Sequence, residues 1–171
     1  MEYFALIDKR YSCRRYTGEP IDEEVIRKVA SAAIVAPSAG NLQGYRIILV
    51  KSRDVIERLA KASYSQKCIA AANAVLAFVA EPKRSGMRYG KRGEELYSLQ
   101  DATIAATFAH LAATDLGLGS VWVGAYDDRL VCEILGVSPP DKVVALLPLG
   151  IPGEAPRKRE RRSFKDIVRE I

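Results

Sequence analysis

The sequence predicts a domain of the α/β or α+β class, because segments with a helical period alternate with short apolar strands. Residues 25–34 place apolar side chains three or four positions apart, as one face of a helix requires. Residues 47–50 (IILV) form a short apolar run that is typical of a buried strand. The 171 residues are enough for one domain, 1–171, with an adequate core that a second chain could complete.

Two helices are expected before the first strand. Residues 2–10 have apolar side chains on one side of a short helix, and a TGEP turn follows at 17–20. Asp22 is a natural N-cap for a helix that runs to Ile34, because its carboxylate can accept hydrogen bonds from the free amides of the first turn.

The middle of the chain again alternates helix and strand patterns, and a segment without any hydrophobic period follows. After a strand at 45–50, Asp54 is expected to cap a helix, with Glu57 in the capping-box relation. Residues 74–80 (AVLAFVA) form a second buried strand. Residues 82–93 are polar, basic and glycine-containing, so a surface loop of the kind that often covers a site is expected there.

The second half contains the longest expected helix, at about 94–116. Its apolar positions are mainly alanine and lie nearly all round the helix, which predicts burial in the core or at a subunit contact. The remaining expected elements are a strand at 118–126, a helix capped by Asp127 and ended by Gly136, a strand at 143–150 and an amphipathic segment at 164–168.

The net charge of +5 is concentrated near the two chain ends. Residues 157–171 hold seven Lys or Arg against three acids, and residues 9–16 (KRYSCRRY) form a second basic cluster. Two such clusters suggest an anionic ligand gathered between them or a nucleic-acid surface, whereas a solvated tail and turn would explain most of these charges. The nearby aromatic residues do not repeat as stacking platforms for nucleic acid would.

Several kinds of site are not expected. The three cysteines are isolated and His110 is the only histidine, which argues against a zinc or iron–sulfur site. The Walker A and G-x-S-x-G motifs are absent, and residues 117–119 (GLG) lack the third glycine of a dinucleotide fingerprint. A single helical histidine is usually a packing or surface residue, so the sequence assigns His110 no role.

The sequence also predicts a cytoplasmic protein that does not enter a membrane. No apolar run approaches the length of a membrane span, and the N-terminus lacks the core of a signal peptide.

Residues 37–44 concentrate hydroxyl and amide groups between a helix and a strand. An ordinary polar turn would explain them, and so would a loop that faces a flat, polar-edged ligand. Because no strong nucleophile, base or metal site is visible, an enzyme built on this chain would depend on a cofactor for its reactivity. Positive charge beside such a loop suits a planar, phosphate-bearing cofactor such as flavin mononucleotide (FMN).

Four motifs in the right order resemble the FMN-dependent nitroreductase family, over nearly the whole chain. Residues 10–14 (RYSCR) are similar to the family's R-R-S-x-R, and residues 36–43 (APSAGNLQ) to its A-P-S-x-x-N-x-Q loop. Residues 117–125 (GLGSVWVGA) resemble its G-L-G-x-x-W-x-G segment, and Arg159-x-Arg161 its basic C-terminal element.

The resemblance implies an α+β sandwich, with a central, mostly antiparallel sheet flanked by helices. It also implies an intertwined homodimer in which residues 152–171 extend to the partner subunit and non-covalent FMN occupies two interface sites. The residues it assigns to the phosphate and ribityl chain are Arg10, Ser12, Arg14, Arg159 and Arg161, and Tyr11 in the same segment is counted among the cofactor-binding residues. The residues assigned to the ring from the partner chain are Pro37, Ser38, Ala39 and Asn41. Gln66 is assigned to the pyrimidine edge of the ring, and Val123 and Gly124 are assigned to positions behind the ring.

Two of these positions depart from the family pattern. Tyr11 stands where a basic residue is frequent, and Gly124 stands where some members have Glu. One phosphate donor is therefore expected to be missing, and backbone rather than a carboxylate is expected to meet the ring.

The implied activity is ping-pong transfer of hydride from NADH or NADPH through flavin N5 to small acceptors such as nitroaromatics, quinones or flavins. No catalytic side chain and no metal ligand is assigned. The alternatives are a flavin-fragmenting or dehalogenating relative, a basic nucleic-acid-binding protein, and a flavin-carrying or regulatory protein without turnover. The homodimer is expected to bind neither nucleic acid nor membrane.

Overall fold

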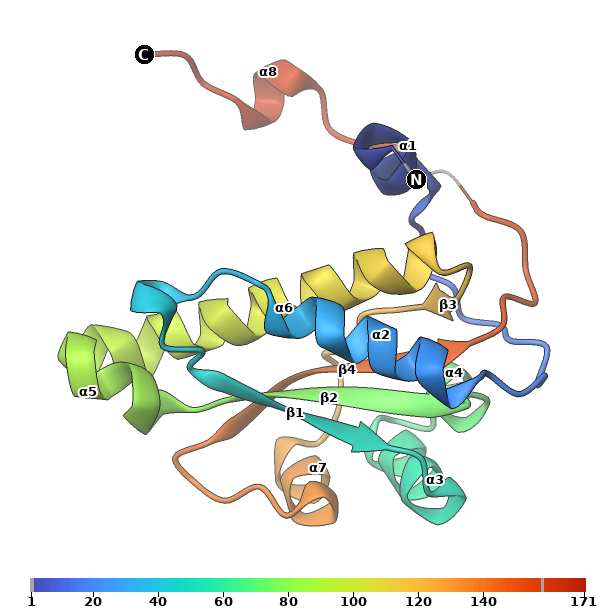
Figure 1. Ribbon diagram of the computed structural model, residues 1–171, viewed down its shortest axis with the longest axis horizontal. Helices are drawn as coiled ribbons and strands as arrows, with labels where there is room; N and C mark the ends of the chain where they lie inside the picture. Colours follow the sequence, from blue (N-terminus) through green and yellow to red (C-terminus); the bar gives the residue numbers. More distant parts are fainter. Residues whose placement is uncertain (1, 158) are drawn as a thin grey trace.

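The computed structural model describes residues 2–157 and 159–171, and its centre is a four-stranded antiparallel sheet (Figure 1). The strand order is β1 (Tyr45–Val50), β2 (Ala74–Ala80), β4 (Lys142–Gly150) and β3 (Gly119–Ser120), and each neighbouring pair is antiparallel. An antiparallel sheet flanked by helices confirms the predicted α+β class. Lys158, which the basic C-terminal cluster includes, lies outside the described residues.

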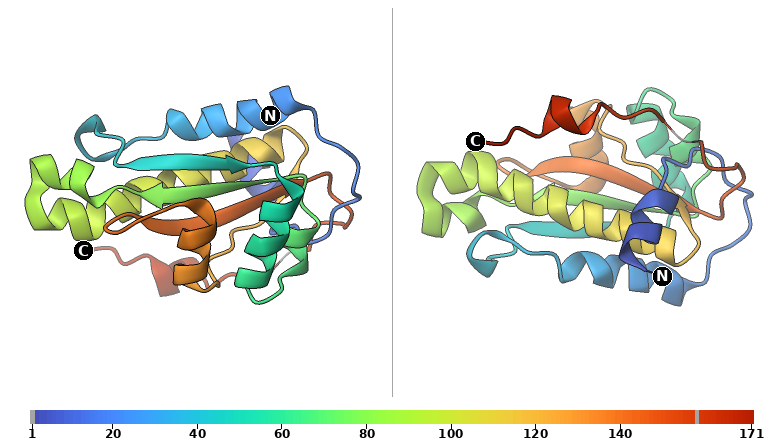
Figure 2. Two further views of the ribbon diagram at one scale, coloured as in Figure 1. Left: turned by 90° about the horizontal axis from the view of Figure 1, so that it is seen from below. Right: turned by 90° about the horizontal axis from the view of Figure 1, so that it is seen from above.

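Helices cover both faces of this sheet (Figure 2). The longer helices α2 (Glu23–Ile34) and α6 (Ser98–Asp115) pack on one face, and the other face carries α3 (Arg53–Ala62), α4 (Lys67–Ala70) and α7 (Asp128–Leu135). All seven residues of β2 are buried, because alternate side chains enter the two cores. A strand covered on both faces reads as a continuous apolar run, as the sequence analysis expected for 74–80.

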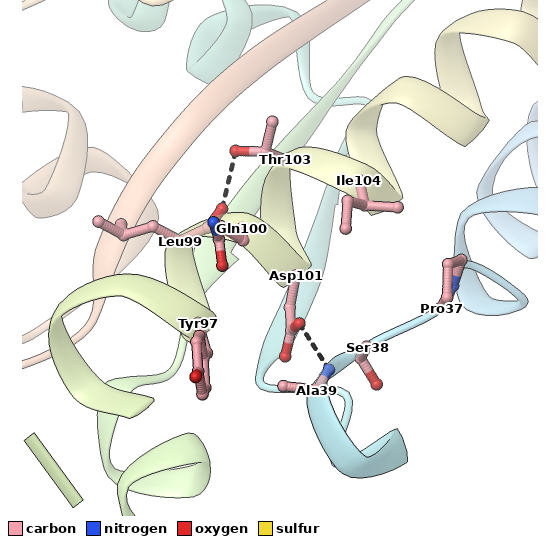
Figure 3. Close-up of a pocket in the computed structure, with 9 residues that line it drawn as sticks. All are labelled: Pro37, Ser38, Ala39, Tyr97, Leu99, Gln100, Asp101, Thr103 and Ile104. Carbon is pink, nitrogen blue, oxygen red and sulfur yellow. Dashed lines mark hydrogen bonds between the residues drawn. The ribbon is translucent and has the colours of Figure 1, made fainter. Parts of the chain in front are cut away.

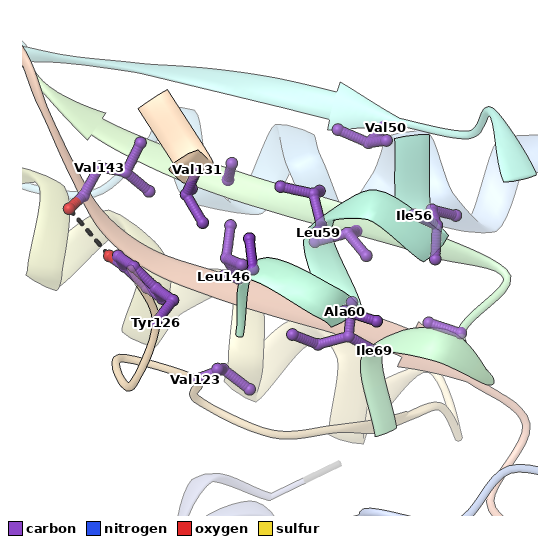
Figure 4. Close-up of a cluster of buried hydrophobic side chains, with 14 of the residues drawn as sticks. Val50, Ile56, Leu59, Ala60, Ile69, Val123, Tyr126, Val131, Val143 and Leu146 are labelled. Carbon is purple, nitrogen blue, oxygen red and sulfur yellow. Dashed lines mark hydrogen bonds between the residues drawn. The ribbon is translucent and has the colours of Figure 1, made fainter. Parts of the chain in front are cut away.

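The core beneath the sheet is built from branched aliphatic side chains of α3, α4, α7 and β4 (Figure 4). The hydroxyl of Tyr126 in this core is satisfied, because it donates a hydrogen bond to the carbonyl of Val143 at 2.9 Å. Leu59 and Ile69 are fully buried there, so the helices after β1 are fixed in position by apolar contact.

The core on the opposite face depends on small residues. Five alanines of α6 have no exposed surface, and they let this helix approach both α2 and the sheet closely: Ala102, Ala105, Ala106, Ala109 and Ala113. The predicted alanine-rich helix is therefore confirmed as a core element, although a short π-helical turn, η2 (Gly93–Tyr97), precedes it.

Three predicted caps are confirmed. The carboxylates of Asp22 and Asp127 accept hydrogen bonds from the amides of Glu24 and Leu130 in the first turns of α2 and α7. Gly136 ends α7 in the left-handed conformation, with φ of 65°. The predicted cap at Asp54 is wrong, because α3 begins earlier, with Ser52 as its N-cap and Asp54 in its first turn.

The predicted loop at 82–93 is wrong, because this segment is helix α5 (Pro82–Arg92). Most of the helix is exposed, so no apolar period reveals it in the sequence. It is held against η2, where the rings of Tyr89 and Tyr97 meet edge to face with centroids 5.1 Å apart. Gly93 makes this contact possible, since a Cβ there would lie 2.4 Å from the carbonyl oxygen of Ser85.

The predicted strand at 118–126 is largely wrong as well. Only Gly119 and Ser120 pair with β4 as a strand, and Val123 makes one further bridge, to Leu146. The side chain of Trp122 is partly exposed between these two contacts, so the segment does not form a continuous strand along the edge of the sheet.

The two chain ends lie outside the layered body (Figure 1). Helix α1 (Tyr3–Lys9) lies over the C-terminal end of α6, and α8 (Phe164–Ile167) lies near the C-terminus, away from the sheet. Phe4, Phe164 and Ile167 are each more than 60% exposed, so both ends present apolar side chains that this chain does not cover.

Candidate functional site

Residues from both chain ends line one cavity of about 860 Å³. The segment after α1 contributes one side of it and the segment before α8 contributes the other. Six sequence-predicted residues therefore lie together around a single cavity: Arg10, Tyr11, Ser12, Arg14, Arg159 and Arg161.

The cavity is strongly cationic. Eight of its fifteen lining residues are Lys or Arg, and two are Asp or Glu. In the parts of the chain that the structure describes, Arg10, Arg14, Arg159 and Arg161 form no side-chain ion pair. Burial and, secondly, the charge of Arg161 lower the pKa of Arg10. Crowded guanidinium groups of this kind are stabilised by an anion between them.

The backbone of the 10–16 segment is anchored to the sheet. The amide of Cys13 donates to the carbonyl of Ser120 at 3.0 Å, and the Cys13 side chain is fully buried. Its neighbours Ser12 and Arg14 are exposed, as the alternation of an extended chain requires. The sequence RYSCR thus presents its polar side chains to the cavity while its cysteine fills the interior.

One carboxylate already sits at the rim of this cavity. The backbone amide of Arg14 donates to Oε1 of Glu154 at 2.6 Å, and the hydroxyl of Tyr11 donates to the carbonyl of the same residue at 2.8 Å. The donor geometry of the rim is therefore suited to negatively charged oxygen atoms. Glu154 is not among the residues predicted from the sequence.

His110, to which the sequence assigned no role, lies against Arg10. Nη1 of Arg10 donates to Nε2 of His110 at 3.0 Å, and Nδ1 of His110 lies 2.5 Å from Oγ of Ser120. Burial, and secondly the charge of Arg10, lower the pKa of His110 to about 4, so the imidazole is neutral at pH 7. A histidine on the buried side of an alanine-rich helix was the only sign of this contact in the sequence.

A second cavity, of about 600 Å³, lies at the other end of α6 (Figure 3). Pro37, Ser38 and Ala39 line it together with Tyr97 and side chains from the first turns of α6. The buried carboxylate of Asp101 accepts hydrogen bonds from the amides of Ala39 at 2.9 Å and Gly44 at 3.3 Å. This carboxylate fixes the polar loop against the helix.

The polar loop itself is tightly wound. It includes the short 3₁₀-helix η1 (Ala39–Asn41), and Gly40, Asn41 and Gln43 have positive φ. The amide of Gln43 donates to Oγ of Ser38 at 2.9 Å, which closes the turn. A Cβ on Gly40 would lie 2.5 Å from the hydroxyl of Tyr89, so α5 covers this side of the loop.

Four predicted ring-binding residues line neither of these two cavities: Asn41, Gln66, Val123 and Gly124. The side-chain amide of Gln66 donates to the carbonyl of Ala125 at 2.9 Å, and Val123 is buried in the core beneath the sheet. Lys67, the neighbour of Gln66, lines the cationic cavity instead. Lys67 is not among the residues predicted from the sequence, and the role predicted for Gln66 at the ring edge stays a prediction.

The two cavities lie at opposite ends of α6. Asp101 contacts the polar loop and His110 contacts Arg10, and these two residues are nine positions apart on the helix. At 1.5 Å per residue, that spacing is about 14 Å along the axis. Within one chain, the cationic residues and the polar loop are therefore separate.

Two kinds of feature do not occur in residues 2–157 and 159–171. No group of three or more His, Cys, Asp or Glu side chains is arranged to hold a metal ion. No helix in these ranges has both the length and the apolar character needed to cross a membrane.

A protein-family model described as the nitroreductase family matches residues 7–87 and 64–151 of the chain. A protein of Archaeoglobus fulgidus with the provisional name NADH dehydrogenase/NAD(P)H nitroreductase is 34% identical over 155 residues. That match covers 88% of this chain and 86% of the relative.

Solved structures show the same fold. A nitroreductase family protein from Clostridium novyi superposes with a TM-score of 0.81 at 30% identity, over 93% of this chain and 89% of the other. The NADPH:FMN oxidoreductase of Vibrio harveyi, solved in complex with NAD⁺, superposes with a TM-score of 0.89 at 26% identity, over 98% of this chain and 76% of the other.

Proposed function

Since the chain belongs to the nitroreductase family and is an NAD(P)H-dependent oxidoreductase, we propose that it binds FMN non-covalently and delivers electrons from NADH or NADPH to small acceptors. The proposed acceptors are nitroaromatics, quinones or flavins, taken up in a ping-pong scheme. The observation that carries the proposal is the cavity that Arg10, Arg14 and Arg161 line, whose guanidinium groups form no ion pair among the described residues.

The donors around this cavity fit a phosphate monoester. The guanidinium groups and the hydroxyl of Ser12 are donors, and the amide of Arg14 is already bound to a carboxylate oxygen. Charge-assisted hydrogen bonds of this kind contribute about 1.5–3 kcal/mol each. In this proposal Arg10, Ser12, Arg14, Arg159 and Arg161 hold the phosphate, and Lys67 is available to a more distant part of the same ligand.

FMN, when bound, supplies the hydride chemistry that no side chain of this chain offers. The protein's part is to bind and orient. Ser38 and Asn41 belong to a loop whose backbone is fixed by Asp101, so its polar groups are held in place before a ligand arrives. We assign no side chain an acid–base or covalent role.

We propose that the complete site needs two chains. The cationic cavity and the polar loop lie at opposite ends of α6, so a two-fold axis that sets two α6 helices antiparallel would bring the loop of one chain to the arginines of the other. The exposed side of α6 offers Phe108, with 37% of its surface accessible, and Thr107 to such a contact.

The chain ends support the same assembly. Phe4 in α1 and Phe164 and Ile167 near the C-terminus are largely exposed, and covering them in a partner would remove this apolar surface from water. We propose that residues 1–171 form one domain and that residues 152–171 extend to the second subunit, which makes the dimer intertwined.

The test is spectroscopic and uses the purified protein. We expect a yellow protein that bleaches with NADH or NADPH under anaerobic conditions and recolours when a quinone is added. A colourless protein that does not take up FMN, and that binds oligonucleotides with a steep salt dependence, would contradict the proposal.

A further inference from the structure

We propose that His110 is a positioning residue that fixes the guanidinium of Arg10 toward the phosphate of the flavin cofactor without neutralising its charge. This inference rests on the proposed function, because it concerns the same cationic cavity. His110 does not line that cavity and acts only through Arg10.

The direction of each hydrogen bond follows from the chemistry of the donors. A guanidinium group can only donate, so Nε2 of His110 must accept from Arg10 at 3.0 Å. The proton of the neutral ring is then on Nδ1, which donates to Oγ of Ser120 at 2.5 Å. Arg10, which can only donate, thereby sets the tautomer, and Ser120 accepts the proton of Nδ1 and fixes the orientation of the ring.

The three residues come from three separately anchored parts of the fold. His110 lies on α6 and is 8% exposed, Ser120 lies on β3 and is 2% exposed, and Arg10 follows α1. The backbone carbonyl of Ser120 also accepts from the amide of Cys13, three residues after Arg10. One strand residue therefore holds both the histidine ring and the segment that carries the cationic side chains.

The neutral charge of His110 affects how strongly Arg10 can attract an anion. A carboxylate at position 110 would form an ion pair with Arg10 and cancel the charge that attracts a phosphate. An apolar side chain would leave a partly buried N–H of the guanidinium without an acceptor. The neutral imidazole satisfies that N–H and leaves the full charge of Arg10 available to the cavity.

A purely structural role for His110 makes a different prediction from a positioning role. If the imidazole only fills space and satisfies a buried donor, its loss lowers stability and weakens binding of every flavin equally. If it aims Arg10 at the phosphate, its loss weakens binding of FMN and spares riboflavin, which has the same ring system and no phosphate. The ratio of the two affinities therefore separates the roles.

The experiment measures dissociation constants of FMN and riboflavin for the flavin-free protein by quenching of flavin fluorescence. His110→Leu is expected to weaken FMN binding about tenfold while riboflavin binding changes less than about twofold. His110→Gln, whose side-chain oxygen can still accept from Arg10, is expected to recover most of the FMN affinity. Circular dichroism establishes that each variant is folded.

A double-mutant cycle with Arg10→Ala shows whether His110 acts through that arginine. Once Arg10 is absent, His110→Leu should cause no further loss of FMN affinity, so the two effects should be far from additive. If His110→Leu does not fold, Ser120→Ala, which removes only the partner of Nδ1, is measured in the same way and should lower the ratio of FMN to riboflavin affinity.

The outcomes separate this inference from the function on which it rests. If the wild-type protein binds FMN no more tightly than riboflavin, the proposed phosphate site is wrong and the role of His110 falls with it. If the wild-type protein prefers FMN and the His110 and Ser120 variants keep that preference unchanged, the positioning role alone is wrong.

Discussion

The backbone amide of Ala39 donates a 2.9 Å hydrogen bond to the buried carboxylate of Asp101, which joins the polar loop to the first turn of the central helix. The other oxygen of the same carboxylate accepts from Gly44 at the far end of the loop. A single buried side chain therefore holds both ends of the segment that we propose to face the flavin ring.

Replacing Asp101 with Asn should loosen this loop. The amide has only one acceptor oxygen, so one of the two backbone donors loses its partner, at a cost of about 1–3 kcal/mol in the free energy of unfolding. FMN affinity should fall as well. Urea unfolding and flavin titration measure the two effects, and Asp54→Asn, at an exposed position in the first turn of α3, is the matched control. Unchanged stability and affinity in Asp101→Asn would show that the carboxylate does not organise the loop.

Removing two of the converging arginines should release the cofactor. In Arg10→Ala combined with Arg161→Ala, FMN affinity is expected to fall at least about a hundredfold, because two charge-assisted contacts are lost. The dimer should stay intact in sedimentation experiments. Arg129→Ala, which removes an exposed arginine from α7, should keep its flavin. Full flavin content in the double variant would remove the phosphate assignment.

The free energy of unfolding should depend on pH in a way that reflects the lowered pKa of the buried His110. Its pKa is lowered from an ordinary 6.5 to about 4 by burial and by the facing charge of Arg10, with Arg161 beside that arginine. The unfolded chain therefore takes up a proton near pH 6.5, whereas the folded chain does not until about pH 4. The stabilisation of the folded state that comes from this difference in proton uptake is fully present above pH 6.5 and is lost as the pH falls toward 4.

Comparison with His110→Gln isolates that contribution. The difference in unfolding free energy between the wild-type protein and the variant should shrink by an amount on the order of 3 kcal/mol between pH 7 and pH 4. Urea denaturation at a series of pH values measures it. A difference that stays constant across this range would mean that the imidazole is not held neutral in the folded state.

Polar substitutions at the C-terminal end should weaken the dimer. Phe164→Ser combined with Ile167→Ser removes two exposed apolar side chains, which would contribute roughly 1.5–3 kcal/mol each if a partner buries them. Analytical ultracentrifugation should show a dissociation constant raised about a hundredfold or more, together with reduced flavin content. Leu130→Ser, on the exposed side of α7, serves as the control. An unchanged dimer would mean that residues 152–171 do not reach the partner.

The fold was predictable where local chemistry and tertiary contacts agree. The strand at 74–80 is apolar because both faces are covered, and Asp127 and Gly136 mark the ends of α7 through their own capping preferences. Helix α5 was missed because its stability comes from contacts with η2, and its exposed, basic surface has no apolar period. The predicted strand at 118–126 was too long because the segment pairs with β4 only at Gly119, Ser120 and Val123.

The candidate site was predictable where it depends on residue type and order. The arginines near both termini were selected as one group, and they line one cavity. The contact of His110 with Arg10 joins residues 100 positions apart, and no spacing in the sequence marks it. Gln66, which the resemblance assigned to the ring edge, donates its side-chain amide to the carbonyl of Ala125, and its neighbour Lys67, which was not predicted, lines the cationic cavity.

The most direct test is a crystal structure of the protein with FMN bound. We expect the phosphate within hydrogen-bonding distance of Arg10 and Arg161 of one chain, and the ring against Ser38 of the second chain. A flavin whose phosphate lies away from these arginines, or whose ring and phosphate both contact a single chain, would contradict the proposed site.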